Sequence, residues 1–112
     1  MPLIQINIST ESIVEDDSLQ KEISKKVSTL TGKPESYVMT ILQTNTEMTF
    51  SGSQEPCCFI KLKSIGSLEP SSMTNTLCDL IASKTNIKQN RIYIEFTDVK
   101  STHWGYNNST FG

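Results

Sequence analysis

An internal repeat constrains the fold of this chain more than any other feature of its sequence. The two halves carry the same pattern of apolar and hydroxyl residues at a separation of 54 positions. The matched positions are Ile6 and Ile60, Leu19 and Met73, Ile23 and Leu77, Val27 and Ile81, Thr31 and Thr85, and Val38 and Ile92. A repeat of this length indicates that one supersecondary unit occurs twice.

Each half has the pattern of a strand, an amphipathic helix and a second strand. The strand-like runs cover residues 2–8, 37–43, 57–63 and 91–96. The helical faces consist of Leu19, Ile23, Val27 and Leu30 in the first half, and of Met73, Leu77, Leu80 and Ile81 within 71–85 in the second. Gly32 is expected to end the first helix, and the turn-rich segment 51–56 separates the halves.

Tandem βαβ units predict an α+β fold in which a single domain, residues 1–112, forms a four-stranded mixed sheet. Because such crossovers are right-handed, both helices are expected on one face of the sheet. The strand segments "CCFI" and "YVM" are apolar at consecutive positions, which is typical of strands covered on both faces. Two helices can cover only one face of the sheet, and the only partner that the sequence guarantees for the other face is another copy of the chain. We therefore expect a homo-oligomer, of an order that these patterns alone do not give.

Charge and composition argue against several classes of protein. The formal net charge is −2 and no basic stripe would bind nucleic acid. No apolar run is long enough for membrane insertion, and the N-terminus lacks a signal-peptide pattern, so we expect a cytoplasmic protein. Cys57, Cys58 and Cys78 are an odd number for a disulfide framework and are expected to be packing residues. With a single histidine, His103, expected in a loop, we expect no metal site and no cofactor.

Pro2 is the first candidate for chemistry. It follows Met1, and removal of that methionine would give Pro2 a free secondary amine. An α-amino group has an ordinary pKa of about 7.7–8.0, and burial or a nearby cation would lower it toward the working pH of a general base. The alternative is that Pro2 merely begins a strand, a position where proline is tolerated.

Lys33 and the C-terminal aromatic residues are the other candidates. Lys33 follows the first predicted helix, either as a solvated loop lysine or as a cation that binds a substrate carboxylate. Trp104, Tyr106 and Phe111 lie within eight residues of a tail that would be costly to leave in water. That tail either packs on its own domain or docks on a neighbouring copy and lines a pocket.

Six segments between residues 1 and 112 are distinctive when taken together, namely "MPLI", "TGKPESYVM", "FSGSQEPCCF", "SIG", "RIYIEF" and "GYNNSTFG". In sequence, order and spacing they resemble the macrophage migration inhibitory factor proteins of the tautomerase superfamily. The resemblance implies a homotrimer with an active site between adjacent subunits. It also implies an isomerase, a keto–enol tautomerase of small aromatic keto acids such as phenylpyruvate and often of dopachrome. Members commonly act as cytokines that leave the cytoplasm by non-classical secretion and bind a cell-surface receptor.

The resemblance also implies roles for individual residues. Pro2 matches the catalytic proline, and Lys33 matches the lysine that binds the substrate carboxylate. The remaining matches are Ser64 and Ile65 in a segment facing the pocket, Tyr37 at its edge, Phe111 at its rim, and Tyr93 contributed by the adjacent subunit.

The chain departs from the family pattern at several positions. Glu95 replaces the usual asparagine, and its carboxylate would oppose an anionic substrate or raise the pKa of the proline amine. Trp104 and Tyr106 change the shape of the aromatic tail, which would alter substrate preference. Ile60 breaks the C-x-x-C motif of some members, so we expect no oxidoreductase activity, and Ser12 stands where members use an arginine to contact a receptor. The alternative function is a secreted, cytokine-like signalling ligand whose pocket is vestigial or serves as a receptor epitope.

Overall fold

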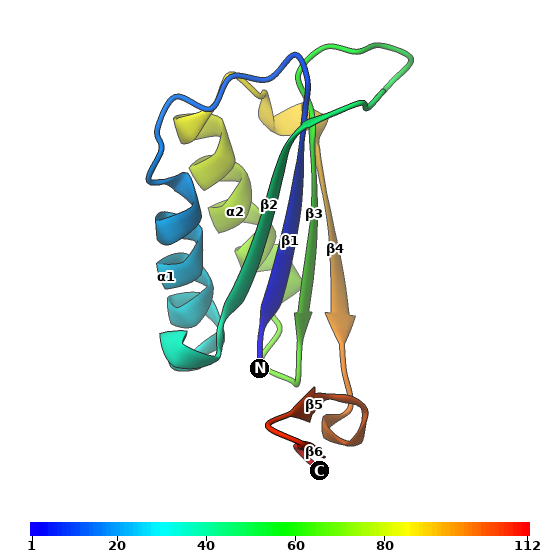
Figure 1. The fold of residues 1–112 in the computed structure, drawn as a ribbon. Coiled ribbons are helices and arrows are strands. Elements are labelled where there is room, and N and C mark those ends of the chain that lie inside the picture. The colour runs from blue at the N-terminus through cyan, green and yellow to red at the C-terminus, as the bar shows by residue number, and fades with distance from the viewer.

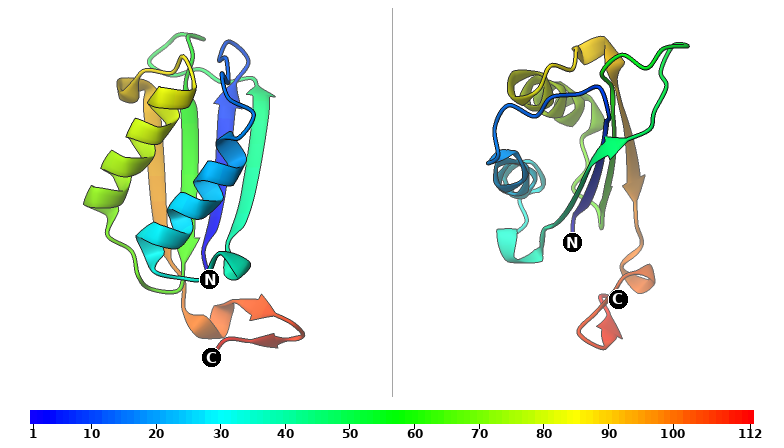
Figure 2. Two further views of the ribbon diagram at one scale, coloured as in Figure 1. Left: turned by 90° about the vertical axis from the view of Figure 1, so that its left-hand side faces the viewer. Right: turned by 45° about the horizontal axis from the view of Figure 1, so that its top comes forward.

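The computed structural model describes residues 1–112 and contains a four-stranded sheet with two helices on one face (Figure 1). The main strands are β1 (Leu3–Ser9), β2 (Met39–Thr46), β3 (Cys58–Ser64) and β4 (Ile92–Asp98), and the helices are α1 (Leu19–Thr31) and α2 (Pro70–Lys84). Their order in the sheet is β2-β1-β3-β4. The pairs β1–β2 and β3–β4 are parallel, whereas the central pair β1–β3 is antiparallel. The predicted fold class is confirmed, with both helices side by side on the same face (Figure 2).

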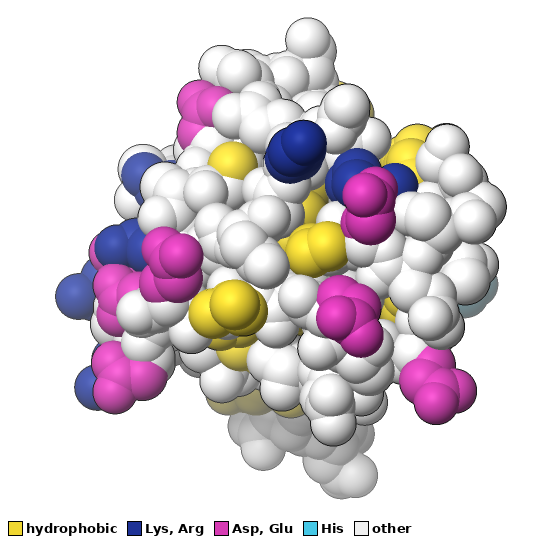
Figure 3. Space-filling view, turned by 90° about the horizontal axis from the view of Figure 1, so that it is seen from above, with side chains coloured by type: hydrophobic (Ala, Val, Ile, Leu, Met, Phe, Trp, Pro, Cys, Tyr) yellow, Lys and Arg dark blue, Asp and Glu magenta, His cyan; other side chains and the backbone are white.

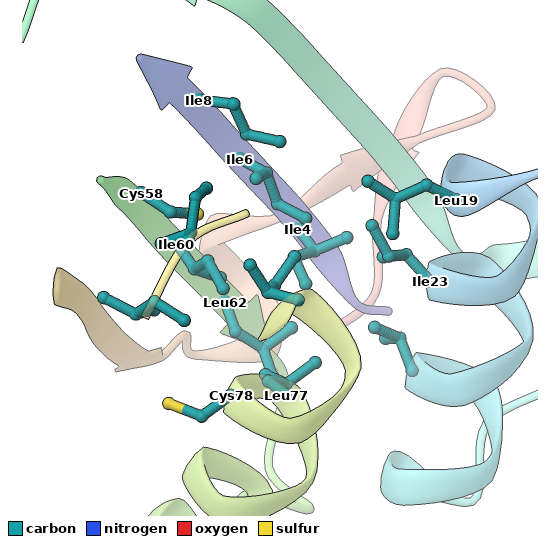
Figure 4. Close-up of a cluster of buried hydrophobic side chains, with 14 of the residues drawn as sticks. Ile4, Ile6, Ile8, Leu19, Ile23, Cys58, Ile60, Leu62, Leu77 and Cys78 are labelled. Atoms are coloured by element: carbon teal, nitrogen blue, oxygen red, sulfur yellow. The ribbon is translucent and has the colours of Figure 1, made fainter. Parts of the chain in front are cut away.

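The internal repeat forms the core. Its helix positions are all buried: Leu19, Ile23, Val27 and Thr31 in α1, and Met73, Leu77, Ile81 and Thr85 in or just after α2. They pack on alternate side chains of the two central strands, Ile4, Ile6 and Ile8 of β1 and Cys58, Ile60 and Leu62 of β3 (Figure 4). Each unit therefore contributes one helix and one central strand to a shared apolar layer, whose burial drives folding.

The start of the second strand differs from the sequence prediction by two residues and changes the place of Tyr37. The second strand was expected to begin at residue 37, but Glu35–Tyr37 form a short 3₁₀ turn and β2 begins at Met39. This turn is closed by a hydrogen bond from the Tyr37 amide to the Pro34 carbonyl, with N and O 3.0 Å apart. Consequently Tyr37 lies at the end of the sheet near the N-terminus rather than inside a strand.

The sheet face opposite the helices is uncovered in the single chain. Met39 of β2 and Tyr93 of β4 lie at opposite margins of this open face and are 61 % and 65 % exposed. The central strands present mainly polar side chains there, namely Gln5 and Asn7 of β1 and Lys61 and Lys63 of β3. As expected from two helices on one face, a single chain covers only one side of the sheet, so any covering of the other side must come from another molecule.

The end of the molecule that carries the loops has no dominant charge. Acidic and basic side chains are scattered over this end, and hydrophobic side chains appear only in small separate patches (Figure 3). Neither helix of the structure combines the length and the apolar character that crossing a bilayer requires.

An ion-pair network attaches the loop after β1 to the second helix. The Lys84 ammonium contacts the carboxylates of Asp16 and Glu22, with N–O distances of 2.9 and 3.2 Å. Hydrogen bonds from Ser18, followed by that from Lys84, hold the pKa of Asp16 well below its ordinary value. The hydrogen bonds that the Lys84 ammonium donates to Asp16 and Glu22 raise the pKa of Lys84.

Asp16→Asn is expected to lower the melting temperature by a few degrees at neutral pH, because the variant loses these charge-assisted contacts. A carboxyl whose folded-state pKa is depressed stabilises the fold above its unfolded pKa, and that stabilisation is lost as the pH falls toward the folded value. The difference between wild type and variant should therefore be constant above about pH 5 and shrink below about pH 4. Thermal melts between pH 3 and pH 8 measure this difference in melting temperature, and Asp17→Asn, at an exposed neighbouring position, is the control. A difference that is as large at pH 3 as at pH 7 would contradict a depressed pKa of Asp16.

Candidate active site

A cavity lies where β1 begins, between the turn that precedes β2 and the C-terminal tail. It has a volume of about 320 Å³. Its lining consists of Met1, Pro2, Leu3, Ser36, Tyr37, Val38, Met39, Trp104, Gly105, Tyr106 and Phe111. We refer to it as the proline cavity, because the side chain of Pro2 is fully buried in its wall.

The sheet register holds Pro2 in place. The Met39 amide donates a hydrogen bond to the Pro2 carbonyl, with N and O 3.1 Å apart, just beyond the paired residues Leu3 and Met39. The pyrrolidine ring fixes φ, so the direction of the nitrogen follows from the direction of the strand. Met1 is half-buried and lines the same cavity, so it occupies the space in front of the Pro2 nitrogen.

The cavity disfavours a charged amine at the start of the chain. Burial, followed by the positive charge of Lys33, lowers the pKa of the Met1 amino group. Lys33 does not line the proline cavity, but it lies near enough for its charge to act there. It follows Gly32, whose left-handed φ of 69° ends α1 and turns the chain toward the N-terminus.

The C-terminal tail packs on its own chain and closes one side of the cavity. It forms a small hairpin of β5 (Gly105–Tyr106) and β6 (Ser109–Thr110), below the N-terminus in Figure 1. The two connecting asparagines have positive φ values of 50° and 70°, as a two-residue hairpin turn of this kind requires. This answers the question that composition left open: the tail packs on its own domain and also lines a pocket.

Aromatic rings hold this hairpin against the turn before β2. Tyr106 and Phe111 stack with ring centroids 5.5 Å apart. The ring of Tyr37 meets both edge-on, at 5.7 Å from Tyr106 and 6.4 Å from Phe111. Such contacts add roughly 0.5–1.5 kcal/mol each beyond the burial of the rings. The cavity wall is thus a preformed aromatic surface.

Half of the candidate residues do not line the proline cavity. Pro2, Tyr37, Trp104, Tyr106 and Phe111 are brought together there, whereas Lys33, Ser64, Ile65, Tyr93 and Glu95 are not. Ser64 ends β3, and its hydroxyl oxygen is buried without a hydrogen-bond partner.

Tyr93 and Glu95 lie far from Pro2 within one chain. They belong to β4, which is separated from β1 by β3, and Tyr93 pairs with Phe59 at the loop end of the sheet. Pro2 lies at the other end, where the chain begins (Figure 1). One copy of the chain therefore cannot bring the Pro2 nitrogen and the Tyr93 ring into a single pocket.

Tyr93 borders a second cavity of about 570 Å³, the tyrosine cavity. Its lining consists of Met48, Thr49, Phe50, Ser51, Cys57, Cys58, Phe59 and Tyr93. Arg91 donates hydrogen bonds to the carbonyls of Ser53, Glu55 and Pro56 at 3.0–3.4 Å, and its guanidinium lies 5.2 Å from the centroid of Phe50. Phe50 in turn packs on Tyr93, with centroids 4.6 Å apart. These contacts hold the Tyr93 ring in a defined place on the open face.

The buried thiols are poor candidates for reactivity. Burial, followed by the nearby thiols of Cys57 and Cys78, raises the pKa of Cys58 to about 12. A thiol with such a pKa is not a nucleophile at neutral pH. No three His, Cys, Asp or Glu side chains gather in a way that would hold a metal ion.

Sequence reasoning missed several lining residues. Met39 and Leu3 line the proline cavity because their strands pair at that level, and Ser36 and Val38 because the turn before β2 lies against the tail. Their residue types give no signal of a site. Only the parallel pairing of the first two strands, which the βαβ pattern predicts, would have suggested that Met39 lies beside Leu3.

Comparisons with known proteins agree on one family. The family model described as macrophage migration inhibitory factor (MIF) matches residues 1–112. A macrophage migration inhibitory factor homolog from Brugia malayi is 39% identical over 112 residues, covering 97% of this chain and 96% of the relative.

Two solved structures have the same fold over nearly the whole chain. The homologue from Prochlorococcus marinus is 45% identical with a TM-score of 0.89, and covers 98% of this chain and 99% of its own. The factor from Trichinella spiralis is 30% identical with a TM-score of 0.90, covering 97% and 99%. The chain belongs to the macrophage migration inhibitory factor family.

Proposed function

We propose that this protein is a keto–enol tautomerase of small aromatic keto acids of the phenylpyruvate type, with the Pro2 amine as its general base. One observation carries the proposal: Pro2 is buried in the wall of an aromatic cavity in which burial and the Lys33 charge lower the pKa of the chain's first amine. Both causes would act on the Pro2 amine once Met1 is removed. The family to which the chain belongs supports this kind of activity.

The reaction needs one base and one cation. The neutral Pro2 amine takes the proton from the carbon next to the keto group, and the C–H electron pair forms the carbon–carbon double bond. The keto oxygen becomes an enolate and takes a proton from water, and the Pro2 ammonium returns its proton to solvent. A lowered pKa raises the fraction of the amine that is neutral at a given pH, and the neutral form is the one that acts as a base.

The other residues would bind the substrate. Lys33 would attract the carboxylate as a point charge at the end of α1. The aromatic rings of Tyr37, Trp104, Tyr106 and Phe111 would enclose the substrate ring. A volume of about 320 Å³ lies at the lower end of small-molecule sites, which suits a substrate with one ring.

We propose that the complete site forms between copies in a homotrimer. Within one chain Tyr93 and Glu95 are out of reach of Pro2, yet Tyr93 is 65 % exposed on the open face. The ring lies on the sheet face that a single chain leaves uncovered, so a second copy that covers this face would bury it. Adjacent copies that cover each other's open faces would bring Tyr93 of one copy to the proline cavity of the next.

The direct test follows phenylpyruvate enol–keto conversion by ultraviolet absorbance, using untagged protein whose intact mass shows that Met1 is absent. We expect saturable turnover that is largely lost when two aromatic rings of the cavity wall are removed by Tyr106→Ala together with Phe111→Ala. Protein of the correct mass, folded and without turnover above the buffer rate would refute the proposed function.

Glu95→Gln is expected to improve the enzyme for anionic substrates. Glu95 lies beside Lys61 in the register, but the Lys61 ammonium lies 5.7 Å from the Phe59 ring centroid, and both ion pairs of the chain belong to Lys84. An unpaired carboxylate facing the pocket would repel a keto acid by about 1 kcal/mol, or roughly fivefold in affinity. KM for phenylpyruvate should therefore fall about fivefold, while KM for its methyl ester stays unchanged. Equal changes for both substrates would contradict this role.

A signalling function is the second candidate, because the family is named for an activity on macrophages. The structure supports a signalling function less well at Ser12. The Ser12 hydroxyl lies 2.7 Å from that of Ser9 in a half-buried pair, which leaves it poorly placed to replace a receptor-contacting arginine. Receptor binding by protein without tautomerase activity would favour this candidate. Cytoplasmic location with non-classical secretion stays a prediction.

A further inference from the structure

Two side chains of α1 hold the backbone of Lys33. The Ser28 hydroxyl donates a hydrogen bond to the Lys33 carbonyl, with an O–O distance of 2.6 Å, and the Lys33 amide donates to the Thr31 hydroxyl at 3.4 Å. Both polar groups of the Lys33 peptide backbone are therefore attached to the last turn of the helix. Pro34, which follows, restricts Lys33 further to extended conformations. Together these contacts set the direction in which the lysine side chain leaves the backbone.

The second half of the chain provides an internal comparison. At the end of α2 the Thr85 hydroxyl donates to the Ile81 carbonyl at 2.7 Å and accepts from the Ile87 amide at 3.1 Å. The Thr31 hydroxyl likewise donates to the Val27 carbonyl at 2.7 Å. The threonine contact thus belongs to the general architecture, since it occurs in both halves.

The serine contact occurs in the first half alone. The position that corresponds to Ser28 is Ala82, which has no hydroxyl, and the position that corresponds to Lys33 is Ile87. Ile87 is 2% exposed and is held by packing in the core. Lys33 is only half-buried and lacks this core packing, and the hydrogen bond from Ser28 holds its backbone instead.

The geometry of Ser28 is also unlike that of its helical neighbour. A serine or threonine inside a helix commonly donates to the carbonyl four residues earlier, as Thr29 does to Lys25 at 3.1 Å. Ser28 instead donates forward, beyond the end of the helix, to Lys33. Its hydroxyl fixes the loop rather than the helix.

We propose that Ser28 is a positioning residue that aims the Lys33 ammonium at the substrate carboxylate. This inference rests on the proposed function, in which Lys33 binds that carboxylate. Without the hydroxyl, the Lys33 carbonyl is no longer attached to α1, so the loop and the ammonium spread over more positions within the extended range that Pro34 allows. Affinity for the carboxylate falls, whereas proton transfer by Pro2 continues.

The test compares Ser28→Ala with the matched control Thr29→Ala. In Ser28→Ala, KM for phenylpyruvate should rise about threefold to tenfold, the range expected for one lost hydrogen bond, with kcat within about twofold. KM for the methyl ester of phenylpyruvate should not change, because the ester offers no carboxylate. Thr29→Ala should leave KM unchanged for both phenylpyruvate and its methyl ester. In a Lys33→Met background, Ser28→Ala should produce no further change.

A second measurement needs no turnover. NMR titration of the Pro2 amine in ¹⁵N-proline-labelled protein should show a higher pKa in Ser28→Ala than in wild type, because the Lys33 cation no longer stays close. If the keto-acid and ester KM values change equally and the amine titration is unchanged, Ser28 only stabilises the helix end and the inference is overturned. If the titration shifts but no variant turns over phenylpyruvate, the positioning role stands and the proposed function fails.

Discussion

Extending the chain by one alanine between Met1 and Pro2 is expected to lower kcat for phenylpyruvate by about 10²- to 10⁴-fold, the range that general base catalysis contributes. The extension makes the Pro2 nitrogen an amide, which has no basic lone pair. It also moves the free amine by about 3.8 Å, one Cα spacing, away from the aromatic cavity. The fold should persist, because the extension lies ahead of the first strand and outside the core. Intact mass and stopped-flow absorbance measure processing and turnover on the same sample.

Pro2→Gly is the matched variant, since it keeps a terminal amine but loses the ring that orients it. Its kcat should fall less than that of the extended chain, because a primary amine is still a base. In wild type the rate should fall as the pH drops through the pKa of the Pro2 amine, which burial and Lys33 would lower as they lower that of the Met1 amino group. An extended chain that turns over at the wild-type rate would show that the Pro2 nitrogen is not the base.

Much of the fold follows from hydrophobic spacing alone. Leu19, Ile23 and Val27 repeat every four residues and are buried where α1 meets the sheet. The same spacing 54 residues later buries Met73, Leu77 and Ile81. Because both βαβ crossovers are right-handed, the two helices then lie on the same face of the sheet. Local turn chemistry was harder to foresee, because the 3₁₀ turn ends at Tyr37, an aromatic residue of the kind that also favours a strand.

The candidate site was only partly predictable, for a different reason. Pro2, Tyr37 and Phe111 meet through contacts within one chain, which the order of strands, helices and tail produces. The clustering of Tyr93 and Glu95 with Pro2 does not follow from the topology of a single chain, because β4 and the chain start lie at different places in the sheet. That part of the prediction came from resemblance, and an assembly is needed to test it.

A mixture of two impaired variants is expected to recover activity if the site lies between copies. The first variant carries the extra alanine before Pro2, and the second is Tyr93→Ala, which removes the exposed ring of the open face. Tyr93→Ala should lose at least about tenfold in kcat/KM, because an aromatic ring that becomes buried in the assembled site contributes several kcal/mol of contact. In each pure variant every site between copies is therefore damaged, either at the Pro2 amine or at Tyr93.

Subunit exchange redistributes these defects. In a ring of copies each site takes Pro2 from one chain and Tyr93 from the next, so in an equal mixture about one interface in four is intact in both halves. Turnover should rise to about a quarter of the wild-type value after co-refolding, and native mass spectrometry should show mixed trimers. If instead Tyr93 acts on the Pro2 of its own chain, or does not act at all, mixing cannot raise the activity above the average of the two pure variants. That outcome would leave the proline cavity as a complete site in each chain. The exposed Tyr93 would then need a different explanation.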